Sequence, residues 1–181
     1  MNRLLAVRED GLFDLGDLLE GRCTLADAVL PTGTAGLMLL QGPSAIDWTP
    51  QAAAVQLLRE ELAGEEQYDV LLWSCPPGAG ALPAGLLRAS QVLALETVLA
   101  PAAVEAAAKT AEWWARQGAE CPRAIFNRVG RRLPKNLGYL HLDAVLHALG
   151  APLLALIPAA AELTYSPAPG HIARRLCADR P

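Results

Sequence analysis

The chain has 181 residues, of which 52% are hydrophobic, and its formal net charge is -4. This hydrophobic fraction excludes a generally disordered protein, because so much apolar surface has to be buried, and the length suits one domain over residues 1–181. Nucleic-acid-binding domains usually carry a basic excess, so the acidic charge argues against a nucleic-acid partner.

Neither a membrane span nor a secretory signal is recognisable in the sequence. The longest apolar stretch, 150–161, contains Pro152 and Pro158 and is shorter than the roughly 20 residues that a spanning helix needs. The N-terminal segment is charged by Arg8 and lacks the apolar core of a signal peptide. The four cysteines form no CxxC pair, so we expect reduced thiols and a cytoplasmic protein.

Two short helical patterns begin the chain. Leucines recur on one helical face over 12–20, and Gly21 follows as a stop. Thr24 with Asp27 three residues later predicts a capped second helix that ends near Leu30.

A short apolar run at 37–41 predicts a buried strand, and Thr49 followed by Pro50 predicts a helix to about Gly64. The clearest strand pattern covers 70–73. Further strands are predicted at 92–96, 124–126 and 153–157, and further helices at 101–117 and 140–149, with loops at 78–85 and 166–170.

These strands are apolar throughout, which is typical of a parallel sheet that helices cover on both faces. The predicted fold is therefore α/β, with three layers and a mostly parallel sheet of about five strands. Right-handed strand–helix–strand connections would join neighbouring strands.

Ligands of such sheets bind beyond the C-terminal ends of the strands. The predicted strand ends carry Asn127 and Arg128, Pro158, and the loop from Ser74 to Gly78. An amide side chain at a strand end can bind a purine edge through its paired donor and acceptor. Asparagine is also a common turn residue, and Gly and Pro also simply end strands, so the residues alone leave both interpretations open.

A cysteine- or serine-dependent enzyme is a second interpretation of the same loop. Ser74 and Cys75 follow a strand at a sharp turn, and His141, His147 and His171 lie elsewhere in the chain. The Gly-x-Ser-x-Gly sequence of a nucleophile elbow is absent, because Trp73 precedes Ser74. No metal site is expected, since the cysteines and histidines lack ligand spacing.

Five segments resemble the MinD/ParA family of P-loop ATPases, whose MinD members determine the site of the bacterial division septum. They occur in the family's order with similar gaps: FDLGDLLEGRCTL at 13–25, YDVLLWSCPPG at 68–78, IFNR at 125–128, the stretch 140–158, and IARRL at 172–176. The resemblance implies a P-loop NTPase fold that lacks the N-terminal Walker A strand, loop and helix, since the chain begins roughly where these should have ended.

The residues that the family uses on the triphosphate are also replaced. A phosphate loop needs a lysine after glycine-rich backbone, but Lys109 follows Ala108 and Lys135 follows Pro134. Ser74 stands where the family has a Walker B acidic residue, and a hydroxyl carries no charge to organise Mg²⁺. The resemblance therefore implies a MinD-like protein of septum-site determination that does not hydrolyse ATP and acts by binding protein.

On this interpretation the chain has no catalytic residue. Asn127, Arg128 and Pro158 would be a vestigial nucleotide base site, with Ser74 and Gly78 a vestigial Walker B and switch loop. No cofactor is expected, although the resemblance leaves room for weak ATP or ADP binding.

We expect a protein partner or a second copy to bind where the sheet is left open by the missing N-terminal strands. The basic segment 172–180 is too short for a stable membrane anchor. Two alternatives remain: a truncated gene model or fragment of an active MinD-type ATPase, and a Cys-dependent enzyme at the Ser74–Gly78 loop.

Overall fold

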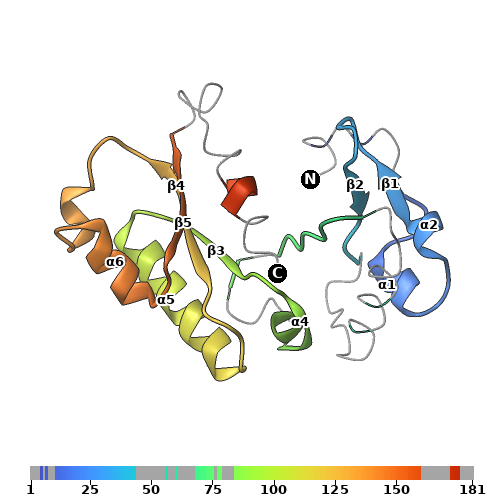
Figure 1. Ribbon diagram of the computed structural model, residues 1–181, viewed down its shortest axis with the longest axis horizontal. Helices are drawn as coiled ribbons and strands as arrows, with labels where there is room; N and C mark the ends of the chain where they lie inside the picture. Colours follow the sequence, from blue (N-terminus) through green and yellow to red (C-terminus); the bar gives the residue numbers. More distant parts are fainter. Residues whose placement is uncertain are drawn as a thin grey trace. The chain divides into compact units, whose positions relative to one another are not determined.

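The computed structural model divides the chain into two compact units, Met1–Leu71 and Leu72–Pro181, whose elements are labelled in Figure 1. Each is described by itself, and the single domain expected over 1–181 stays a prediction. The structure describes residues 5, 7, 11–43, 56, 60, 68–75, 77–78, 84–159 and 172–175.

The first helix of the first unit, α1, covers Leu15–Leu19. It begins three residues later than the leucine pattern predicts because Asp14 caps it. The Asp14 carboxylate accepts hydrogen bonds from the backbone N–H groups of Gly16 at 2.7 Å and Asp17 at 3.2 Å, and Asp17 accepts one from the Asp14 backbone. This reciprocal capping satisfies N–H groups that the first turn of a helix leaves unpaired.

The second helix, α2, covers Leu25–Ala28 and confirms the cap predicted at Thr24. Thr24 Oγ1 accepts from the backbone of Asp27 at 3.3 Å, and the Asp27 carboxylate accepts from the Thr24 backbone at 3.0 Å and hydroxyl at 2.6 Å. The Thr24 hydroxyl and then its backbone N–H hold the pKa of Asp27 below its ordinary value. The helix ends before Leu30 because a strand begins at Val29.

The strand predicted at 37–41 forms, but the prediction that it is buried is wrong. It covers Met38–Leu40 as β2 and pairs antiparallel with β1, Val29–Pro31. Leu37 and Met38 are 41% and 38% exposed. A two-stranded sheet has no flanking strands and little packing on its faces, so burial of the kind found in a wide parallel sheet is not available to it.

The helix predicted from Thr49 to Gly64 lies mainly outside the described residues. Gln56 and Glu60 are described and helical, and the Gln56 amide donates to the Glu60 carboxylate at 2.8 Å. This spacing of four residues places the two side chains on one helix face.

The prediction of a strand at 70–73 is wrong, because these residues have no regular secondary structure. Val70, Leu71 and Leu72 are 62%, 47% and 82% exposed. A strand needs a hydrogen-bonded neighbour for its backbone, and within the described residues no strand pairs with this run.

The second unit contains a parallel sheet, which confirms the α/β class. Its order is β3-β4-β5, where β3 covers Ala94–Val98, β4 covers Arg123–Val129 and β5 covers Leu153–Pro158. The described residues thus hold three parallel strands and one antiparallel pair, in place of the single sheet of about five strands.

The helices of the second unit largely follow the prediction. The long helix α5, Pro101–Arg116, has proline at its first position, and α6, Leu142–Leu149, ends at Gly150 with φ 60°. These positions suit proline, which needs no donor there, and glycine, which tolerates positive φ. The structure adds α4, Ala84–Ala89, which overlaps the predicted loop at 78–85, and the short 3-10 helix η2, Lys135–Leu137.

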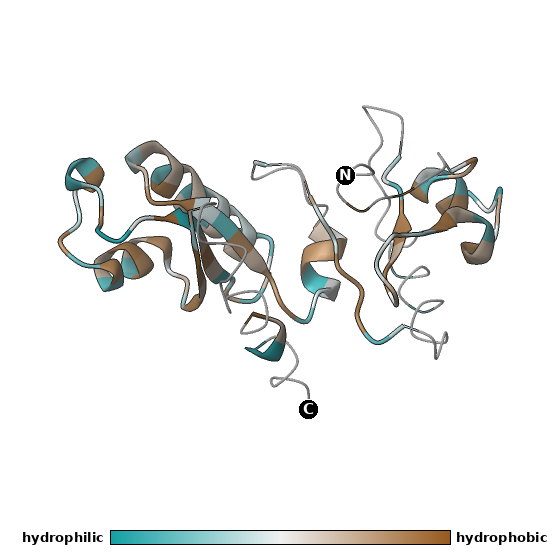
Figure 2. Cartoon of the chain, turned by 90° about the horizontal axis from the view of Figure 1, so that it is seen from above, coloured by the Kyte–Doolittle hydropathy of each residue, from teal (hydrophilic) through white to brown (hydrophobic). Residues whose placement is uncertain are grey.

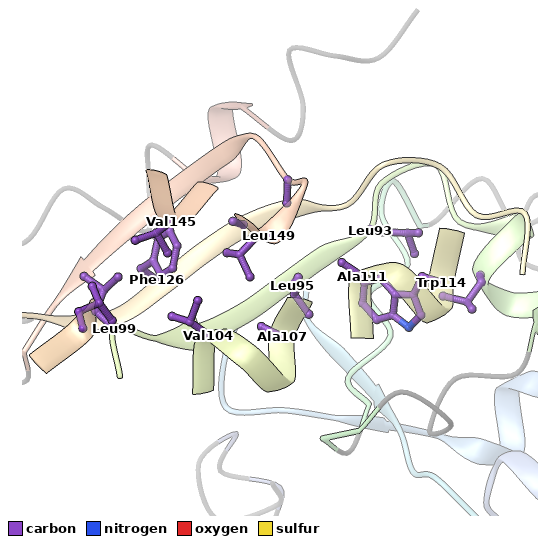
Figure 3. Packing of buried hydrophobic residues seen from close by; sticks show 14 residues of the cluster. Leu93, Leu95, Leu99, Val104, Ala107, Ala111, Trp114, Phe126, Val145 and Leu149 are labelled. Carbon is purple, nitrogen blue, oxygen red and sulfur yellow. The ribbon is translucent and has the colours of Figure 1, made fainter. Parts of the chain in front are cut away.

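The core of this unit lies between the sheet and the helices α5 and α6 (Figure 3). Phe126 of β4 and Val145 of α6 are 0% exposed, and Val104 of α5 is 2% exposed. Trp114 is also buried, and its Nε1 has no hydrogen-bond partner within the described structure, whereas Trp113 is half-buried. One of the two adjacent indoles therefore fills the core.

Strand β3 is not covered on both faces by the described elements. Its Leu95 and Thr97 are buried, whereas Ala94, Glu96 and Val98 are exposed. Within the described residues, α5 and α6 pack on the first of these faces (Figure 1). The expectation that all strands are covered on both sides therefore fails for β3, and its second face carries a charged residue.

Candidate functional site

The candidate site lies where β4 and β5 end. Phe126 pairs with Leu156, and Val129 pairs with Pro158. Between these two pairs β4 therefore advances by three residues while β5 advances by two. The extra residue forms a β-bulge, and Arg128 within it has φ 55°. Non-glycine residues rarely adopt this conformation, and bulges of this kind often lie beside binding sites.

Asn127 precedes the bulge, and both ends of its amide are engaged. Its Nδ2 donates to Glu96 Oε1 of β3 at 2.7 Å. Its Oδ1 accepts from the backbone N–H of Arg128 at 2.7 Å. The amide is therefore fixed in orientation by one bond to the neighbouring strand and one to its own backbone.

Glu96 is the residue of this site that the sequence analysis missed. The apolar strand predicted at 92–96 includes this residue without giving it a role. A single carboxylate within a run that is otherwise Leu, Ala, Thr and Val was a usable signal, because charged residues are rarely placed inside strands covered on both faces.

A shallow hollow of about 220 Å³ lies beside the bulge. It is lined by Val129, Gly130, Arg131, Leu156 and Pro158. This volume is below the roughly 300–1,000 Å³ of sites that bury a drug-sized ligand. The hollow therefore lies at the edge where a parallel sheet binds ligands, but it does not enclose a nucleotide.

Basic residues lie in the bulge and directly after it, and all of them are exposed: Arg128, Arg131, Arg132 and Lys135. Charges on an exposed loop attract anions weakly and are screened by salt. The loop thus offers no enclosed cationic site of the kind that holds a triphosphate in a P-loop.

Ser74 and Gly78 belong to the irregular segment before α4. Ser74 is exposed and does not end a strand, because 70–73 is not a strand. Gly78 is exposed and has φ 119°. The structure thus places Asn127, Arg128 and Pro158 at one edge, while none of the hydrogen bonds described joins Ser74 or Gly78 to it.

Cys75 has little of the character of a catalytic nucleophile. It is half-buried, and burial raises the pKa of its thiol above the ordinary value. A raised pKa keeps the thiol protonated at neutral pH, whereas the thiolate is the nucleophile. His141 occupies the N-cap position of α6 without a side-chain capping bond, and His147 lies in the last turn of that helix. Both are exposed, and His171 is outside the described residues.

Both lysines of the chain lie in settings unlike a phosphate loop. Lys109 is within α5, where its Nζ binds Glu105 Oε1 at 2.7 Å, and this carboxylate raises the lysine pKa. Lys135 starts the short helix η2 directly after Pro134, which has no N–H to donate. Neither lysine follows a glycine-rich strand-to-helix turn.

Two further observations limit the chemistry of the described part of the chain. It contains no group of three or more His, Cys, Asp or Glu residues that could hold a metal ion. Among its helices, none is long and apolar enough to cross a bilayer.

The segment 172–175 is helical and is tied to the sheet of the second unit. Arg175 Nη1 donates to the backbone carbonyl of Leu154 at 2.7 Å. The short helix near the C-terminus carries both hydrophobic and hydrophilic residues (Figure 2), and its arginines Arg174 and Arg175 are exposed. This contact joins the helical residues 172–175 to β5.

Comparison with known proteins gives likeness in structure only. No protein-family model and no curated protein sequence matches the chain. Among solved structures, the MinD cell division protein of Aquifex aeolicus superposes with a TM-score of 0.80 at 18% identity, over 99% of this chain and 80% of that one.

Two other structures agree. MinD in the MinC:MinD cell division protein complex of Aquifex aeolicus gives a TM-score of 0.81 at 18% identity, over 99% of this chain and 79% of that one. The septum site-determining protein MinD of Pyrococcus horikoshii, complexed with Mg-ADP, gives a TM-score of 0.62 at 22% identity, over 95% of this chain and 67% of that one. The chain therefore has the fold of the MinD cell division proteins, which confirms the predicted P-loop NTPase type of α/β fold.

Proposed function

We propose that this chain is a MinD-like protein related to septum-site determination, which does not hydrolyse ATP and acts by binding another protein. The observation that carries the proposal is the placement of its charged residues. Lys109 is paired to Glu105 within a helix, Lys135 follows a proline, and Ser74 replaces the acidic residue of the resembling family.

Phosphoryl transfer depends almost entirely on positioning and on charge that stabilises the transition state. Removal of a single such donor typically lowers the rate by about 10²–10³-fold. A chain without the lysine, the backbone cradle and the carboxylate lacks all three contributions, so we expect turnover no faster than the uncatalysed background.

The protein-binding role is supported by two observations. A solved structure of similar fold is a complex of MinD with MinC. Within the described residues β3 pairs on one side only, with β4, and an unpaired strand edge can bind a strand of another protein. We therefore place the partner, or a second copy of this chain, at the free edge of β3.

The test of the catalytic part is an ATP turnover assay on the purified chain and on Ser74→Asp. Both should release phosphate at the buffer rate, because a carboxylate restored at position 74 still has no lysine or phosphate cradle beside it. Phosphate release by the unaltered chain that rises in proportion to its concentration, and persists after further purification, would refute the proposal.

The protein-binding part is tested separately by light scattering on the chain alone and mixed with a MinC-type protein. We expect a mass above that of the monomer in at least one of these samples. A folded, monodisperse monomer in both would contradict the binding role and leave the ATP result unaffected.

A further inference from the structure

We propose that Glu96 is a specificity-determining residue of the edge formed by β4 and β5: it holds the Asn127 amide and prevents that amide from binding a purine base. This inference rests on the proposed function, because it treats the edge as a nucleotide site that no longer serves nucleotides. The missing lysine and carboxylate concern the triphosphate, whereas Glu96 concerns the base.

Strand register brings the two side chains together. In the parallel pair of β3 and β4, Glu96 lies opposite Ile125, and Val98 lies opposite Asn127. Side chains two residues apart on a strand share a face, so Glu96 and Asn127 belong to the same face and are one step apart along it. That face of β3 is exposed, which lets the carboxylate reach across without being buried.

The bond between them is of the stronger kind. At 2.7 Å, Asn127 Nδ2 donates to a carboxylate oxygen, and hydrogen bonds to an ionised acceptor are about twice as strong as neutral ones. The second bond, from the Arg128 backbone to Asn127 Oδ1, fixes the other end of the amide. Rotating the amide toward a ligand would break both bonds at once.

A purine base is a poorer hydrogen-bond partner for the Asn127 amide than the Glu96 carboxylate is. An amide binds adenine by donating to a ring nitrogen and accepting from the exocyclic amine. Nδ2 carries two N–H groups and Glu96 accepts from one of them, so a ring nitrogen that accepted from the other would lie beside the charged carboxylate. Both are acceptors, so they repel one another, and the charged carboxylate accepts the stronger hydrogen bond.

The test uses adenosine, which has no phosphates and therefore reports on the base alone. The chain is labelled with ¹⁵N, and adenosine is titrated while the side-chain amide signal of Asn127 is followed. Four proteins are compared: the unaltered chain, Glu96→Ala, Glu96→Gln, and the double variant Glu96→Ala with Asn127→Ala, whose binding is followed by backbone amide signals.

Glu96→Ala should bind adenosine at least about tenfold more tightly than the unaltered chain, because the Nδ2 donor that Glu96 occupies becomes available to the base and the repelling carboxylate is removed. Glu96→Gln keeps an acceptor without the charge, so its affinity should lie between the two. The double variant should return to the affinity of the unaltered chain.

Equal adenosine affinity of the unaltered chain and Glu96→Ala would overturn the inference, and so would undetectable binding by both. Glu96 is exposed, so these variants should fold, and unchanged backbone spectra away from residue 96 would confirm it. ATP turnover by the unaltered chain would instead refute the proposed function, and the adenosine result would still decide the role of Glu96.

Discussion

Replacing Phe126 by alanine should lower the free energy of unfolding of the second unit by about 3–5 kcal/mol. The ring is 0% exposed and belongs to the cluster that joins β4 to the helices α5 and α6. Its removal loses the transfer free energy of the ring and leaves a cavity that the surrounding strands cannot fill. Urea unfolding followed by circular dichroism measures the loss.

Leu140→Ala provides the matched control for this substitution. Leu140 is 86% exposed in the same unit, so its truncation should change the free energy of unfolding by no more than about 0.5 kcal/mol. A loss for Phe126→Ala as small as that of Leu140→Ala would show that the sheet and the two helices do not share this core.

Substitution of Trp114 should give the second large loss in the free energy of unfolding. Two variants separate the contribution of the ring volume from that of the indole N–H. Trp114→Ala should cost about 3–5 kcal/mol, because the indole is 6% exposed within the same cluster (Figure 3). Trp114→Phe should cost far less. It removes a buried N–H that has no partner among the described residues, and such a group costs about 1–3 kcal/mol when left unsatisfied.

The same urea experiment distinguishes the two outcomes for Trp114. If Trp114→Phe destabilised the unit as much as Trp114→Ala, then the indole N–H would have a hydrogen bond in solution. A small loss for phenylalanine and a large one for alanine would show that ring volume is what this position supplies.

Local signals predicted the helices well. The Thr24 and Asp27 cap, Pro101 at the start of α5 and Gly150 after α6 act through bonds or backbone angles within a few residues, so the sequence alone indicates them. The parallel class of the sheet followed from apolar strands that alternate with helices.

Local signals could not predict whether residues 70–73 form a strand. The composition of this segment is that of a strand, yet its pairing depends on a neighbour elsewhere in the chain, and in the described structure Val70, Leu71 and Leu72 are exposed and unpaired. Propensity is a weak guide when a segment has no partner strand. Ser74 consequently lies in an irregular segment and does not end a strand of the described structure.

The candidate site was predicted in part. Asn127, Arg128 and Pro158 do meet where β4 and β5 end, because parallel strands finish at a common edge. The bond joins Asn127 to Glu96, 31 residues away in the chain, and depends on the register between β3 and β4, which the sequence does not state. The bulge at Arg128 likewise arises from the pairing of β4 with β5.

Calorimetric titration of the purified chain with Mg-ATP tests the central claim most directly, since the claim is that no residue set in this chain holds a triphosphate. The account predicts a dissociation constant weaker than about 1 mM, because in the described part of the chain the cations beside the bulge are exposed and screened and the hollow there is shallow. Magnesium-dependent binding in the micromolar range would contradict it.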